Sequence, residues 1–138
     1  MSAIASVQRI LLEAIQNAGF GLPIAYENVN YDASNGEPFL ACFILRAPTV
    51  QAELGYKGCD ERTGIFQIDI NYPEGTGPTV HAEMADDINL LFRSGATFTG
   101  NDFRVNIRNV SAGVMRIGNG WATLPMTIEY YSFTERVQ

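Results

Sequence analysis

The densest group of titratable side chains is the stretch His81-Ala-Glu-Met-Ala-Asp-Asp87, which holds the chain's single histidine. A histidine followed two residues later by a glutamate is the first half of a zinc-deaminase signature. The required Pro-Cys-x-x-Cys half is missing, because no cysteine follows this stretch. We interpret Glu83, Asp86 and Asp87 as a solvated acidic face, since early acidic residues suit a helix dipole. A small metal-dependent hydrolase using His81, Glu83 and Asp87 is the alternative.

A glycine-rich bend follows a strongly alternating run in residues 64–79, GIFQIDINYPEGTGPT. Such a bend before a helix can hold phosphate, because the amides at a helix N-terminus attract anions. A phosphate loop needs a Gly-Lys-Ser/Thr ending, and a dinucleotide loop needs a third glycine. Here Glu74 adds repulsion, and Pro78 suits the start of a helix. We interpret the bend as a hinge, expect no cofactor, and keep a small-ligand module at 74–79 as an alternative.

The charge balance of the chain is acidic, with nine Lys and Arg against fifteen Asp and Glu and a formal net charge of −6. This balance disfavours nucleic-acid binding, which needs a basic footprint. Cys42 and Cys59 form no Cys-x-x-Cys pair and no Cys/His cluster, so neither a disulfide framework nor a metal site is indicated. We also expect no secretion signal and no membrane span.

The apolar periodicity predicts two helices, at 4–18 and 80–92, where apolar residues recur at i, i+3, i+4 and i+7. The strands that we predict are 24–29, 39–46, 64–72, 103–108, 113–118 and 122–133. Residues 39–46 are apolar on both faces, which predicts a strand near the centre of a covered sheet. The turn Gly118-Asn-Gly120 predicts a hairpin between the last two strands.

This order of elements, α-βββ-α-βββ, predicts an α+β fold: a two-layer sandwich of a mainly antiparallel sheet with two helices on one face. At 138 residues we expect a single domain spanning 1–138. The other sheet face would be polar and look toward water, a lumen or a partner. Its predicted members are Gln67, Asp69 and Asn71, with Arg104, Asn106 and Arg108 on the same side.

Aromatic residues near the C-terminus suggest a second use for the last strand. Leu124, Met126, Ile128 and Tyr130 share one face of this strand and are interpreted as core. Tyr131 and Phe133 lie on the other face, and Tyr56 and Trp121 lie in predicted loops. Aromatic residues are enriched in protein interfaces. We therefore predict that Tyr56, Trp121, Tyr131 and Phe133 contact a neighbouring subunit, with further core packing as the alternative.

Taken together, these segments resemble the tail terminator proteins of long-tailed bacteriophages. The resemblance rests on the N-terminal amphipathic helix, on the strand Gly64-Ile-Phe-Gln-Ile-Asp-Ile with its bend and second helix, and on the closing strand Leu124-Pro-Met-Thr-Ile-Glu-Tyr. It covers nearly the whole chain, and only the loop at 47–63 has no counterpart.

The resemblance implies a non-enzymatic structural protein of the virion tail, assembled in the host cytoplasm. Such proteins form a hexameric ring that caps the tail tube, ends tube polymerisation and provides the head-docking surface. The implied partners are further copies of the chain, the tail tube protein and the head-tail connector protein, while DNA passes through without specific binding. Another head-tail joining protein or a tail tube component is the alternative within the structural class.

Overall fold

Two helices and eight strands make up the computed structural model, which describes residues 3–27, 31–32, 36–47, 50–51, 59–100 and 103–135. The elements are α1 (Ala3–Asn17), β1 (Ile24–Tyr26), β2 (Phe39–Arg46), β3 (Val50–Gln51), β4 (Cys59–Pro73), α2 (Thr79–Leu91), β5 (Thr97–Gly100), β6 (Phe103–Ala112), β7 (Arg116–Gly118) and β8 (Trp121–Glu135). Neither helix in these residues has the length and apolar content to cross a membrane.

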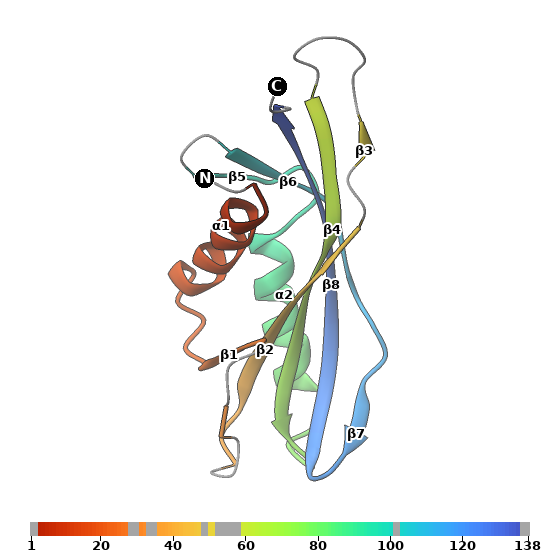
Figure 1. The fold of residues 1–138 in the computed structure, drawn as a ribbon. Coiled ribbons are helices and arrows are strands. Elements are labelled where there is room, and N and C mark those ends of the chain that lie inside the picture. The colour runs from red at the N-terminus through yellow and green to blue at the C-terminus, as the bar shows by residue number, and fades with distance from the viewer. Residues whose placement is uncertain are drawn as a thin grey trace.

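The strands form one mixed sheet in the order β1-β2-β4-β8-β6-β5, with β3 added to β4 and β7 added to β8. Of the pairs in the described residues, only β1 and β2 run parallel. β4 and β8 pair without interruption from Cys59↔Glu135 to Pro73↔Trp121, and Figure 1 shows them side by side as the long spine of the molecule. The predicted α+β sandwich is confirmed, although each half has four strands where three were predicted.

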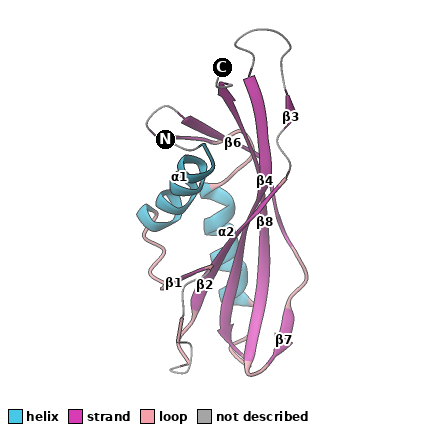
Figure 2. Ribbon diagram, in the orientation of Figure 1, coloured by secondary structure: helices cyan, strands magenta, loops and turns pink. Residues whose placement is uncertain are grey.

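Both helices cover the same face of this sheet (Figures 1 and 2). The apolar stripe of α1 buries Val7, Leu11 and Ile15, which confirms the predicted helix. From α2 and its C-terminal end, Met84, Ile88 and Phe92 enter the same core. The strands β2, β4 and β8 contribute their even-numbered positions, among them Leu40, Ile44, Phe66, Ile68, Ile70, Met126, Ile128 and Tyr130, and β6 contributes Val105 and Ile107. This alternation is that of a sheet covered on one face.

Two glycine-containing bends define the lower end of the sheet as predicted. Asn119 and Gly120 have φ angles of 54° and 83°, the left-handed conformation that a two-residue hairpin turn requires, and they join β7 to β8. In the hinge before α2, Gly75 and Gly77 have φ angles of 92° and 93°. Main-chain hydrogen bonds hold this hinge, including Glu74 N–H to the Gly120 carbonyl at 2.8 Å.

The prediction that β2 lies near the centre of a covered sheet is wrong. β2 is the second strand from the sheet edge, and its only neighbour on the outer side is the three-residue β1. Leu40, Cys42 and Ile44 face the helices, whereas Phe43 and Leu45 face away from them. Leu45 is 54% exposed. The apolar character of both faces therefore reflects an uncovered apolar surface in the described part of this chain.

Candidate functional site

The sheet face opposite the helices is the candidate functional site, and we call it the open face. Cross-strand pairing places its members at odd-numbered positions, because partners in an antiparallel pair share a face. The open face consists of Phe39, Ala41, Phe43 and Leu45 on β2; Thr63, Ile65, Gln67, Asp69 and Asn71 on β4; and Trp121, Thr123, Pro125, Thr127, Glu129, Tyr131 and Phe133 on β8.

The predicted polar residues of β4 form a hydrogen-bonded row on this face. Gln67 Nε2 donates to Asp69 Oδ1 at 2.9 Å, and Asn71 Nδ2 donates to the Asp69 carbonyl at 3.1 Å. From β8, the Thr123 hydroxyl donates to Asn71 Oδ1 at 2.6 Å. Arg116 of β7 lies 3.8 Å from Asp69 Oδ2, and only 13% of the Asp69 side chain is exposed. The row is therefore largely desolvated and satisfied within the subunit.

The other residues predicted for the same side lie along β6, namely Arg104, Asn106 and Arg108. Asn106 is opposite Tyr131, which is on the open face, and accepts a hydrogen bond from the Thr97 hydroxyl at 3.0 Å. The Arg108 guanidinium lies 4.7 Å from the centre of the Tyr131 ring and 3.7 Å from Glu61 Oε2. Arg108 itself lies at a register irregularity of β6 between Ile107 and Asn109. These contacts fix the side chains around Tyr131, near the C-terminal end of β8 on the open face.

Three of the four predicted interface aromatics, Trp121, Tyr131 and Phe133, share the open face but do not form one cluster. Tyr131 and Phe133 pack edge to face at 5.8 Å near one end of β8, and Phe133 is 49% exposed. Trp121 lies at the other end of β8, where its ring packs at 5.2 Å against Phe39. Tyr56 lies outside the described residues. The two ends of the open face thus carry separate aromatic surfaces.

An exposed apolar ribbon at residues 113–118 was not singled out from the sequence as a contact surface. Val114 is 83% exposed and Ile117 is 65% exposed. β7 pairs only with β8 among the described strands, so its outer edge carries unpaired main-chain groups. A signal was present in the sequence, because Val-Met-Arg-Ile between two glycines places large apolar residues beside a tight hairpin.

His81 and the neighbouring acidic residues do not form a common site. His81 is buried, its Nε2 lies 2.8 Å from the Ala122 carbonyl, and its ring packs edge to face on Tyr72 at 5.0 Å. Glu83, Asp86 and Asp87 lie on the exposed side of α2. In the part of the chain that is described, no three His, Cys, Asp or Glu side chains gather as metal ligands. His81 links α2 to β8 and is part of the core.

Comparison with known proteins gives a structural match for the fold and a family match for the sequence. A solved structure superposes with a TM-score of 0.70 at 19% sequence identity, covering 97% of this chain and 94% of the other, and shows that the fold occurs elsewhere. No curated protein sequence matches the chain. The family model described as phage tail terminator protein matches residues 4–130. The chain therefore belongs to the phage tail terminator family and has a structural role in a bacteriophage tail.

Proposed function

We propose that the protein assembles into a six-membered ring that caps the completed tail tube. The ring ends tube polymerisation and presents the surface on which the head-tail connector docks. The observation that carries this proposal is the family match over residues 4–130. The exposed apolar side chains supply its physical support, because a monomeric protein rarely leaves large apolar patches in water.

The open face provides contact surface for this assembly. Leu45 and Phe133 are each about half exposed there, and Tyr131 is held in place by Arg108. We propose that Trp121, Tyr131 and Phe133 contact neighbouring subunits, and Tyr56 stays a prediction outside the described residues. The row Gln67, Asp69 and Asn71 would then border the lumen or a partner.

The proposed role is non-enzymatic, carried by one domain over 1–138, and requires no cofactor. Assembly takes place in the host cytoplasm, and the finished ring is part of the virion tail. The net charge of −6 supports passage of DNA without specific binding, because acidic surfaces repel phosphates.

The decisive experiment adds the purified protein to polymerising tail tube subunits. We expect tube growth to stop when about one ring per tube end is present, with six-membered rings visible at the ends by negative-stain microscopy. Phe133→Ser should weaken capping, whereas Thr97→Ser, an exposed change on β5, should not. Unchanged tube growth at a large excess of folded protein would overturn the proposal.

A further inference from the structure

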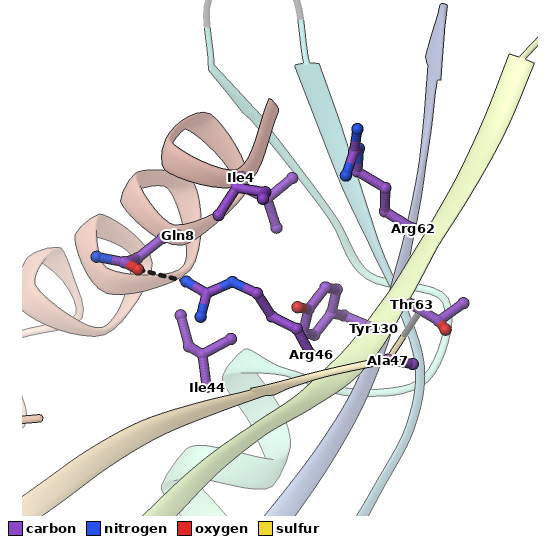
Figure 3. A pocket seen from close by; sticks show the side chains of 9 residues that line it. Ile4, Gln8, Ile44, Arg46, Ala47, Arg62, Thr63 and Tyr130 are labelled. Carbon is purple, nitrogen blue, oxygen red and sulfur yellow. Dashed lines mark hydrogen bonds between the residues drawn. The ribbon is translucent and has the colours of Figure 1, made fainter. Parts of the chain in front are cut away.

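A cleft lies on the helix side of the sheet, and of its described lining residues only Thr63 also belongs to the open face. The cleft lies where the long strands extend past the start of α1, and its volume is about 190 Å³. Val7 and Ile44 form its apolar floor with the ring of Tyr130, and Ile4 stands at its rim (Figure 3). An apolar cavity of roughly 150 Å³ accepts a ring the size of benzene, so this cleft has room for one aliphatic side chain.

Two arginines stand over this apolar floor. Arg46 of β2 donates a hydrogen bond from its guanidinium to Gln8 Oε1 of α1, which holds the cation over the cleft (Figure 3). Arg62 of β4 lines the opposite wall. None of the described residues that line the cleft is acidic. An apolar floor under two cations fits a partner that presents an aliphatic side chain beside carboxylates.

The exposed face of α2 presents this chemistry. Glu83, Asp86, Asp87 and Leu90 are spaced i, i+3, i+4 and i+7, so they lie along one side of the helix. Leu90 is 68% exposed, although a large apolar side chain gains free energy by burial. Two other large exposed apolar residues, Val114 and Ile117, lie beside the cation of Arg116 instead.

We propose that Leu90 of one copy enters the cleft of a second copy, with Asp86 and Asp87 facing Arg46 and Arg62. The two surfaces are different parts of the chain, so the contact is heterologous and leaves one unused surface of each kind on every pair. Repetition of such a contact gives a closed ring or an open filament. The inference rests on the proposed self-assembly and identifies one pair of surfaces that would carry it.

Disulfide trapping tests the contact directly in the full-length chain. The variant Ile4→Cys with Leu90→Cys, in a Cys59→Ser background, should give a covalent ladder beyond the dimer on mild oxidation. Cys42 is buried and does not compete. Either engineered cysteine alone can give no species larger than a dimer. The matched control, Ile4→Cys with Ala82→Cys at an exposed position of α2 about two turns from Leu90, should give no ladder.

Charge exchange provides a second readout. Arg46→Glu should weaken association at least about tenfold, because it places two negative charges opposite each other in the contact. Adding Asp86→Arg in the same chain restores an opposite-charge pair and should recover much of the affinity. Arg9→Glu, a change of the same sign on α1 outside the cleft, should have little effect. If the double-cysteine variant forms rings but no disulfide between positions 4 and 90, the proposed contact is wrong, whereas the proposed ring assembly stands. A protein that stops tube growth while it stays a monomer would overturn both this contact and the six-membered ring. A wild-type protein that forms the 4–90 disulfide ladder but does not stop tube growth would count against the proposed function alone.

Discussion

His81, which the sequence offered as a metal ligand only in the alternative hypothesis, is a core residue in the structure. It has the chemistry of a metal ligand, but its Nε2–H is directed at the Ala122 carbonyl, 2.8 Å away, and the ring is buried between α2 and β8. Histidine suits this position because one ring nitrogen donates a hydrogen bond while the ring body fills space against Tyr72. The residue that looks most catalytic therefore joins the two layers.

Replacing His81 by alanine should lower the free energy of unfolding by about 2–4 kcal/mol, because it leaves a cavity and removes a buried hydrogen bond. Urea unfolding measures this loss. Glu83→Ala, two residues along the same helix but exposed, should change stability by no more than about 0.5 kcal/mol. Equal effects of the two substitutions, or a rise in melting temperature on adding zinc to the wild type, would contradict the structural role.

Cys42 makes the stability of the protein sensitive to alkaline pH. Burial, with a smaller contribution from the charge of Asp69, raises the pKa of the Cys42 thiol from 9.0 to about 12. Because the folded-state pKa is the higher one, the unfolded chain loses this proton first as the pH rises. The stabilisation is complete below pH 9 and is lost progressively between pH 9 and 12.

At pH 11 this difference should cost about 2–3 kcal/mol of unfolding free energy relative to pH 7. Urea titrations of the wild type and of Cys42→Ala, both under reducing conditions, measure it. The variant should start less stable but lose less between pH 9 and 11, since Tyr72 and Tyr130, whose pKa values burial also raises, titrate in both proteins. Parallel pH dependences would exclude the thiol as the cause.

At the scale of elements, Gly64 of β4 leaves the space that the side chain of Tyr130 from β8 occupies. A Cβ at this position would lie 2.6 Å from the Tyr130 hydroxyl and 2.7 Å from the Leu45 carbonyl oxygen. Both distances are too short for a side chain, so the close packing of β2, β4 and β8 at the cleft needs a glycine. In the sequence this glycine stands at the start of the predicted strand, and its contacts with Tyr130 and Leu45 cannot be inferred from its neighbours along the chain.

Gly64→Ala should destabilise the protein by about 1–3 kcal/mol through overpacking. Gly118→Ala is a matched control, because nothing lies within 4 Å of its added Cβ, and it should stay within about 0.5 kcal/mol of the wild type. Tyr130→Phe combined with Gly64→Ala should recover part of the loss, since it removes one of the two close contacts. Thermal melts that rank the two glycine variants equally would argue against this packing.

The predictions of helices and strands succeed where the local apolar periodicity is strong. They fail where a segment is extended only because it pairs with a strand distant in the sequence. α1 and α2 follow from their apolar spacing, and the second half of β4 follows from its alternation. Residues 59–63 at the start of β4 are Cys-Asp-Glu-Arg-Thr, which carry no strand signal. They are extended because they pair with the end of β8, more than sixty residues away. β5 was missed because its four residues owe their structure to β6.

At the scale of the whole molecule, the sequence predicts which residues share the open face. It does not predict which side chains from other strands shield them from water. Strand parity is enough to place Gln67, Asp69 and Asn71 together. Their desolvation depends on Arg116 and Thr123, which reach them from β7 and β8. Long-range pairing of this kind cannot be read from a local pattern. For the same reason the cleft, built from α1, β2, β4 and β8, has no signature in the sequence.

The ribbon at 113–118 gives the last prediction, because its exposed apolar side chains have a consequence only in an assembly. Val114→Ser with Ile117→Ser should leave the unfolding free energy within about 0.5 kcal/mol of the wild type, since both residues are already in water in the isolated subunit. If the ribbon contacts another subunit or the tube, the same variant should weaken association or capping about tenfold or more, as loss of a buried apolar anchor does. Sedimentation velocity and the tube-growth assay measure the two effects, with Thr97→Ser as the control. Normal association together with normal capping would show that the ribbon faces solvent in the assembly, whereas a loss of stability alone would show that it belongs to the core of the subunit.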